Sequence, residues 1–181
     1  MKIYNSAVIS FTKSPTARMG IAFAKEREAL FFTRYLAKGV AITEKETCEG
    51  TIPVVAGGRK AAYYHNCSNR DAGVITVSAS GASAGYVNYW NVPIWASDCT
   101  TVRSKDETKY LTKFIYYLLK LVQTDMYLLQ KGPDQPHVYP GDIAHIMIPD
   151  IDIKRQKNFI ASAKLIEDEI DKLLAGSDSN T

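Results

Sequence analysis

The chain has 181 residues, of which 46% are hydrophobic and 23% are charged, and its formal net charge is +3. This length and composition are typical of one globular domain that buries a core of its own. No apolar run approaches the roughly 18–20 residues that a membrane-spanning helix needs, and residues 1–10 lack the apolar core of a signal peptide. We therefore expect a cytoplasmic protein.

The net charge is unevenly distributed along the chain. Residues 1–70 contain eleven Lys and Arg against five Glu, whereas residues 71–181 contain eleven against fourteen Asp and Glu. A basic half can face phosphates, but an excess of this size is equally compatible with an ordinary solvated surface.

The three cysteines do not predict a disulfide framework. His65 and Cys67 lack a second ligand pair, so we expect a polar turn there and no metal site.

The first predicted element is a helix over residues 24–39. Gly39 is its expected C-cap. Five apolar residues would form the stripe of this helix, at Ala29, Leu30, Phe32, Tyr35 and Leu36. A short buried strand is predicted next, within residues 51–58, and it ends at a double-glycine turn.

Residues 61–102 predict a small sheet. Four β-branched and aromatic runs follow one another, "AAYYHN", "GVITVSAS", "GYVNYWN" and "PIWASDCTTV", with short turns between them. The gaps are too short to hold crossover helices, so we expect mostly antiparallel pairing.

Helical periodicity returns over residues 106–132. Its apolar positions are Leu111, Phe114, Ile115, Leu118, Leu119 and Val122. Residues 133–151 contain four prolines and end in a short apolar strand, "HIMIP", and a final helix is predicted over residues 153–174. The fold class that we predict is α/β of the α+β type: a small, mostly antiparallel sheet with flanking helices and a long C-terminal helix.

The final helix carries a heptad pattern of apolar residues. Such a seam can pack onto its own domain or pair with a partner helix, and its position at the end of the chain favours a partner. The seam consists of Phe159, Ala163, Ile166, Ile170 and Leu173.

Two short patterns are compatible with catalysis. Gly81–Gly85 reads G-x-S-x-G, which would make Ser83 a nucleophile with His137 or His145 as its base. The nucleophile elbow needs a helix after the serine, but "YVNYWNVPIW" predicts a strand, which favours a hairpin loop.

The second pattern is the group of Asp142, Asp152 and Lys154, which resembles the arrangement of metal-dependent nucleases. Asp152 lies where a strand meets a helix, and capping is the commoner role of Asp there. The hydrolase and the nuclease both stay open as alternatives. The usual nucleotide-binding motifs are absent from the sequence, which favours a binding protein.

Three stretches combine small residues with cationic, amide or aromatic side chains: residues 56–66, 78–89 and 131–139. Small residues allow close backbone approach, Arg can pair with guanine, amides can pair with adenine, and Tyr can stack. Plain turn chemistry with core aromatics is the alternative interpretation. The candidate DNA-binding residues are Arg59, Lys60, Tyr63, Tyr64, Ser80, Ser83, Tyr86, Asn88, Gln135 and His137.

Four segments, in this order, resemble one target-recognition domain of the specificity (S) subunit of type I restriction–modification systems. They are "GTIPVVAGGR", "GVITVSASGASAGYVNYWNVPIWASDCTTV", "YLTKFIYYLLK" and "KGPDQPHVYPGDIAHIMIPDIDIKRQ". The resemblance spans about residues 39–174. It implies a non-catalytic protein without a cofactor that reads half of a split site in double-stranded DNA. Methyl donor and ATP would belong to methyltransferase and restriction subunits.

We expect the chain to be divided into three parts. Residues 1–150 would form the recognition domain, residues 151–175 a spacer or dimerisation helix, and residues 176–181 a flexible tail. Full-length S subunits carry two recognition domains and two spacer helices, whereas this chain has one of each. It would thus be a half-subunit that forms a homodimer, a fragment, or the recognition segment of a fused restriction–methylation enzyme. A homodimer would read a palindromic split site.

Overall fold

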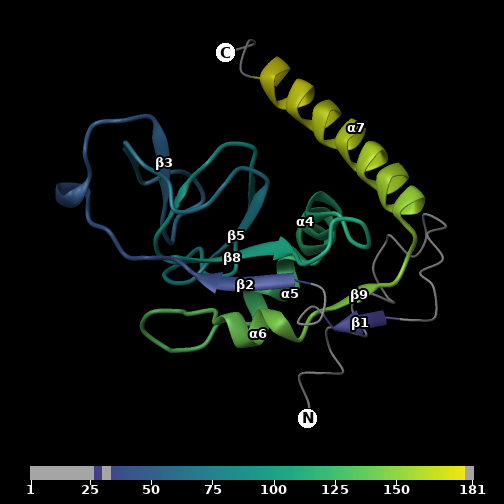
Figure 1. Ribbon diagram of the computed structural model, residues 1–181, viewed down its shortest axis with the longest axis horizontal. Coiled ribbons are helices and arrows are strands. Elements are labelled where there is room, and N and C mark those ends of the chain that lie inside the picture. Colours follow the sequence, from purple (N-terminus) through teal and green to yellow (C-terminus); the bar gives the residue numbers. More distant parts are fainter. Residues whose placement is uncertain (1–26, 30–33, 178–181) are drawn as a thin grey trace.

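The computed structural model describes residues 27–29 and 34–177 (Figure 1). Its main sheet has the strand order β2 (Arg34–Lys38), β8 (Cys99–Ser104), β5 (Val74–Ser78) and β6 (Val87–Trp90), and each neighbouring pair is antiparallel. Every residue of β5 is buried. This observation agrees with the apolar, β-branched run in the sequence, because a strand covered on both faces has no solvated side to keep polar.

Two smaller sheets complete the β structure. β4 (Tyr63–His65), β3 (Ile52–Val55) and β7 (Trp95–Ala96) form one of them, with β3 antiparallel to β4 and parallel to β7. β1 (Arg27–Ala29) pairs antiparallel with β9 (Met147–Pro149) to form the other. The predicted strands of residues 51–102 and the "HIMIP" strand are present, and pairing is mostly antiparallel, as expected.

The main core lies between the four-stranded sheet and helix α4 (Thr112–Leu121). The apolar face of α4, Phe114, Ile115, Leu118 and Leu119, packs with the sheet residues Ile75, Val77, Val87 and Val102. The α+β class is therefore confirmed, with a second, smaller cluster around Val55 and Ile94 under the three-stranded sheet.

The helix predicted over residues 106–132 is shorter and divided. Residues 106–109 form a turn in which the Asp106 carboxylate accepts a hydrogen bond from Thr108 N, 2.8 Å away. α4 starts only at Thr112, and a break at Val122 separates it from α5 (Gln123–Leu128). α6 (Pro140–Ala144) and α7 (Ile153–Ser177) follow. None of the described helices is long and apolar enough to cross a membrane.

The prediction of a helix over residues 24–39 is wrong for the part of it that the structure describes. Arg27–Ala29 is strand β1 and Arg34–Lys38 is strand β2, while Leu30 and Phe32 lie outside the described residues. β2 pairs along its whole length with residues 100–104 of β8. The free edge of β8 offers a full row of backbone hydrogen bonds, and this tertiary pairing overrides a local helical pattern.

Gly39 is consequently not a helix cap. It follows β2, and its N–H donates to the Cys99 carbonyl at 2.9 Å. A Cβ atom at this position would lie 1.8 Å from the Ser97 carbonyl oxygen. Only glycine allows the chain to pass so close to the strand beside it.

The G-x-S-x-G stretch forms the loop of the β5–β6 hairpin, as the strand pattern predicts. Val77 of β5 pairs with Val87 of β6, so a strand and not a helix follows the serine. Gly81 and Gly85 both have positive φ, +74° and +87°. A Cβ atom at Gly85 would lie 2.5 Å from the Met126 carbonyl oxygen, whereas one at Gly81 would meet nothing within 4 Å.

This difference predicts unequal costs for two otherwise identical substitutions. Gly81→Ala pays only for its backbone conformation, about 1 kcal/mol. Gly85→Ala must also displace the backbone of α5, so we expect it to lower the free energy of unfolding by more than about 2 kcal/mol. Urea denaturation of the two variants measures this difference. Equal losses would show that the loop does not pack against α5 as described.

Candidate nucleic-acid interface

Two of the three candidate loops are joined by backbone hydrogen bonds. The hairpin loop 79–86 meets residues 131–138 where Gly81 N donates to the Pro136 carbonyl at 3.0 Å and Val138 N donates to the Ala79 carbonyl at 2.9 Å. Lys131 and His137 close the second loop through a reciprocal backbone pair at 2.8 and 2.9 Å. Because these are main-chain contacts, they hold the loops in place while leaving the side chains available.

The third loop, residues 56–60, lies against the hairpin. The Ser78 hydroxyl donates to the Gly58 carbonyl at 3.1 Å, and the Asn88 amide donates to the Arg59 carbonyl at 3.3 Å. A Cβ at Gly57 would lie 2.8 Å from the Ser80 carbonyl oxygen, so the two loops are in close contact. We call residues 56–60, 79–86 and 131–137 together the three-loop face.

A cationic pair surrounds the aromatic ring at the end of the hairpin loop. The Arg59 guanidinium carbon lies 5.2 Å from the centroid of the Tyr86 ring, and Lys120 Nζ of α4 lies 4.5 Å from it. Both distances are within the range of cation–π attraction. Arg59, Tyr86 and Lys120 thus bring two positive charges and a stacking surface together on the three-loop face.

The ten predicted DNA-binding residues differ in whether their side chains are exposed or already have hydrogen-bond partners. Arg59, Lys60, Tyr64 and Gln135 are exposed. The Ser80 hydroxyl donates to the Asp98 carboxylate, and the Tyr63 hydroxyl donates to the Ile42 carbonyl, so both already have structural partners. Asn88 supports the Arg59 loop. Ser83, Tyr86 and His137 are partly exposed, and the His137 ring stacks on Tyr139 with centroids 6.0 Å apart.

Eight of these ten residues lie on or beside the three-loop face. Tyr63 and Tyr64 instead lie on β4 in the three-stranded sheet. The sequence pattern missed Lys120, which lies on the polar side of an amphipathic helix with no distinguishing motif. It also missed Gln123, whose side chain accepts from Val87 N at 3.0 Å and donates to the Gly85 carbonyl at 2.9 Å.

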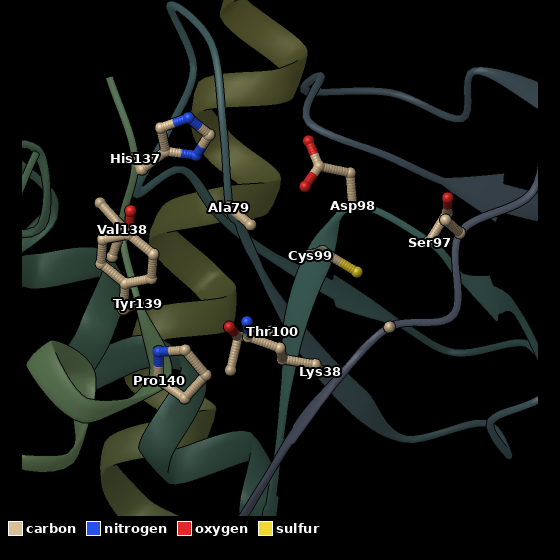
Figure 2. A pocket seen from close by; sticks show the side chains of 12 residues that line it. Lys38, Ala79, Ser97, Asp98, Cys99, Thr100, His137, Val138, Tyr139 and Pro140 are labelled. Atoms are coloured by element: carbon tan, nitrogen blue, oxygen red, sulfur yellow. The ribbon is translucent and has the colours of Figure 1, made fainter. Parts of the chain in front are cut away.

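A hollow of about 220 Å³ borders the three-loop face (Figure 2). His137, Tyr139 and Pro140 line one wall, Ser97 and Asp98 line the opposite side, and Thr100 lies between them. The Thr100 hydroxyl is buried and has no hydrogen-bond partner among residues 27–29 and 34–177. An unpartnered buried hydroxyl is unusual, because its desolvation is not compensated.

The cysteine that lines the hollow is not an activated nucleophile. Burial raises the pKa of the Cys99 thiol, which lines the hollow, to about 12, and the neighbouring Asp98 carboxylate acts in the same direction. The thiol is therefore protonated at neutral pH, and its Sγ lies 3.5 Å from the Val55 carbonyl oxygen. A protonated thiol is a poor nucleophile.

The residues of the proposed nuclease site have structural roles of their own. The Asp142 carboxylate accepts from Lys131 Nζ and from Tyr139 N at the start of α6. Asp152 caps α7 by accepting from Arg155 N at 2.9 Å, as its position at the junction predicts. Within the described ranges, no group of three or more His, Cys, Asp or Glu side chains could hold a metal ion. His65, which forms a candidate pair of metal ligands with Cys67 in the sequence, accepts a hydrogen bond at its Nδ1 from Cys48 N, 2.9 Å away.

The predicted seam of the final helix has two parts. Phe159 and Ala163 pack against the core of their own domain, with the Phe159 ring edge-on to Phe114 at a centroid distance of 5.5 Å. Ile166, Ile170 and Leu173 are 51%, 51% and 68% exposed. Figure 1 shows the C-terminal end of α7 standing clear of the other elements. Of the predicted seam, the part formed by Ile166, Ile170 and Leu173 is therefore the part that is accessible to a partner helix.

The fold and the site together define a class of protein: an α+β domain with three joined loops at one end of a four-stranded sheet and a projecting C-terminal helix. The family model of the type I restriction modification DNA specificity domain matches residues 34–173. The chain belongs to this family. No curated protein sequence matches it significantly.

Solved structures share the fold. A type I restriction–modification S subunit from M. genitalium aligns with a TM-score of 0.77 and 20% identity over 90% of this chain and 44% of that protein. The HsdS subunit from Thermoanaerobacter tengcongensis aligns with a TM-score of 0.66 and 12% identity over 95% of this chain and 46% of its own length. A further match, from work on assembly of the type I R-M system, has a TM-score of 0.67 and 13% identity over 94% and 47%. This chain spans less than half the length of each.

Two adjacent threonines on β8 offer a test of the hollow. The Thr101 hydroxyl donates to the Ala37 carbonyl and accepts from Arg70 Nε, both at 3.1 Å, whereas that of Thr100 has no described partner. We expect Thr101→Val to lower the free energy of unfolding by about 1–3 kcal/mol and Thr100→Val to leave it unchanged or raise it. Thermal and urea unfolding measure both. A loss for Thr100→Val as large as that for Thr101→Val would contradict the described site.

Proposed function

We propose that this chain serves as a specificity component of a type I restriction–modification system and uses the three-loop face to read one half of a split DNA site. The observation that carries the proposal is the fusion of three separate loops into one surface with exposed Arg59, Lys60 and Gln135. A rigid loop surface with cationic and amide side chains suits the major groove, where bases present distinct donors and acceptors. The family match supports the same function.

Affinity and specificity would come from different side chains. Lys60 and Lys120 would contact phosphates, which hold a protein on the duplex without carrying sequence information. Arg59 and Gln135 would read base edges, and Tyr86 would support Arg59 through its ring. Ser80 and Asn88 would act through the loops that they hold in place.

The chain would supply recognition only. It would direct methyltransferase and restriction subunits to the DNA in the cytoplasm, and those partners would provide the methyl donor, ATP and the catalytic groups. The hydrolase and nuclease alternatives lose support, because Ser83 lies in a hairpin loop and both aspartates already have structural partners.

Recognition by the three-loop face predicts a DNA sequence preference that depends on Arg59. The full chain is incubated with a random double-stranded DNA library, and the retained fraction is sequenced. We expect one enriched motif made of two inverted half-sites with a fixed gap. Arg59→Ala should weaken binding to that sequence about tenfold or more, and Lys60→Ala should reduce the salt dependence of binding.

Lys172→Ala on α7 is the matched control for the loss of a positive charge, because Lys172 is exposed and lies beside Glu169, away from the loops. It should bind like the wild type. Enrichment of no sequence above the starting library would refute the proposed function.

The exposed end of α7 predicts a homodimer. Ile166, Ile170 and Leu173 recur at the spacing of one helix face, and burying them against the same residues of a second copy would remove them from water. We expect Ile170→Asp with Leu173→Asp to convert a dimer into a monomer in sedimentation velocity. Lys172→Asp, which places the same charge outside the seam, should remain dimeric. A monomeric wild type at tens of micromolar would contradict this arrangement.

A further inference from the structure

Besides the packing of Phe159 and Ala163 on the core, side-chain hydrogen bonds of Gln156 and Glu167 attach helix α7 to its own domain, and the first of these attachments is Gln156. This side chain is completely buried. Its Oε1 accepts from Leu111 N at 2.8 Å, and its Nε2 donates to the carbonyls of Lys109 and Ile151 at 2.7 and 2.9 Å. Gln156 therefore joins the first turn of α7 to the N-terminus of α4.

The second point of attachment is Glu167, three turns further along α7. Its carboxylate accepts from the Tyr117 hydroxyl at 2.8 Å and from the Tyr116 hydroxyl at 3.3 Å, and both tyrosines belong to α4. Burial raises the pKa of both hydroxyls, and the Glu167 charge raises it further, so they remain donors at neutral pH. Hydrogen bonds to a charged acceptor are stronger than neutral ones.

A lysine lies in the middle of this second attachment. Lys113 Nζ is 3.9 Å from the centroid of the Tyr89 ring, 4.7 Å from that of Tyr116 and 5.2 Å from that of Tyr117. Its ammonium group faces three aromatic rings; burial lowers the pKa of Lys113, and the Glu167 charge offsets only part of this shift. The faces of the rings attract the ammonium group, and the Glu167 carboxylate attracts it across the tyrosines.

Tyr89 connects this cluster to the recognition surface. It lies on β6, the strand that leaves the 79–86 loop, and its ring is 5.3 Å from that of Tyr116. Tyr89, Lys113, Tyr116, Tyr117 and Glu167, which we call the tyrosine clamp, thus form a continuous path from the hairpin of the three-loop face to α7.

We infer that the tyrosine clamp fixes the direction in which the free end of α7 leaves the recognition domain. If the proposed function holds, its residues are positioning residues for the gap between the two half-sites. Gln156 and the packing of Phe159 and Ala163 hold the first part of α7, and the attachment at Glu167, eleven residues and about 16 Å along the axis from Gln156, restricts tilting of the part beyond them.

The geometry makes small tilts important. Ser177 at the end of α7 lies about 21 Å along the axis from Ala163, which packs on the core. A tilt of about 9° beyond Ala163 moves this end by about 3.4 Å, which is the rise of one base pair. Loss of the clamp would therefore let a dimer accept more than one gap length, with the half-sites themselves unchanged.

The direction of α7 can be measured without DNA. In the full chain with Cys48→Ser, a nitroxide on the exposed native Cys67 and a second one on Asp171→Cys report the distance between the domain and the free end of α7. Cys99 is buried and stays unlabelled. An excess of unlabelled chain ensures that each measured pair lies within one molecule.

We expect one narrow distance distribution for this background and for Glu169→Ala, whose side chain forms an exposed ion pair with Lys172 of the same helix. Glu167→Ala should lose the narrow peak. Tyr117→Phe keeps the packed ring and removes one hydroxyl, so it should broaden the distribution even if Glu167→Ala fails to fold. A narrow, unshifted peak in folded Glu167→Ala, or in Tyr117→Phe should the first variant not fold, would overturn the clamp.

The random-library selection then tests the consequence for DNA. Glu167→Ala should enrich the wild-type half-sites with several gap lengths, and Glu169→Ala should enrich them with one. If Glu167→Ala keeps the single wild-type gap, the clamp does not set the spacing. If the wild type itself enriches no split motif, the proposed function fails, and the distance measurement alone decides on the clamp.

Discussion

The backbone hydrogen bonds on both edges of strand β8 determine how the rest of the molecule is arranged. β8 lies between β2 and β5, so both of its edges are paired, and its residues 100–102 face partners on each side. Pairing with β5 positions the hairpin that carries the 79–86 loop, and pairing with β2 draws the chain before Gly39 into the sheet. The strand also carries Thr100 at the hollow and Val102 in the core. A central strand must satisfy all its backbone groups within the protein, so its neighbours have little freedom.

Because the strands next to β8 have little freedom, the loops of the three-loop face can form a surface of defined shape. The three loops are held by main-chain hydrogen bonds and by buried or half-buried side chains such as Ser78 and Gln123. The side chains of Arg59 and Gln135 are exposed, and the backbone hydrogen bonds of the loops do not depend on them. Under the proposed function, the target sequence could therefore change by substitution at these positions without loss of the fold, because a stable scaffold positions the loops.

Two segments show where the sequence pattern predicts the local structure and where it does not. Residues 34–38 carry an apolar spacing compatible with a helix, yet they form β2, since the decisive contact is with a strand more than sixty residues away. The G-x-S-x-G loop was predictable as a hairpin, because the residues on both sides of it have strand character of their own. Among site residues, Arg59 and Gln135 could be found from glycine-rich or proline-rich surroundings, whereas Lys120, Gln123 and Glu167 lie within regular helices, where local sequence does not distinguish them.

By itself the sequence determined the elements whose stability is local: the β5–β6 hairpin, the amphipathic α4, the Asp152 cap and the long final helix. It also indicated the family, because the four ordered motifs can be identified in the sequence without knowing which residues are in contact. Only the tertiary structure decided which partner each element takes, that Phe159 and Ala163 belong to the core, and that α7 is held at Gln156 and Glu167. The physical reason is that these contacts join residues far apart in the chain, 45 and 50 positions for the hydrogen bonds of Gln156 and Glu167 to α4 and more than sixty for the pairing of β2 with β8, and no periodicity within one segment encodes the surface that another segment will present.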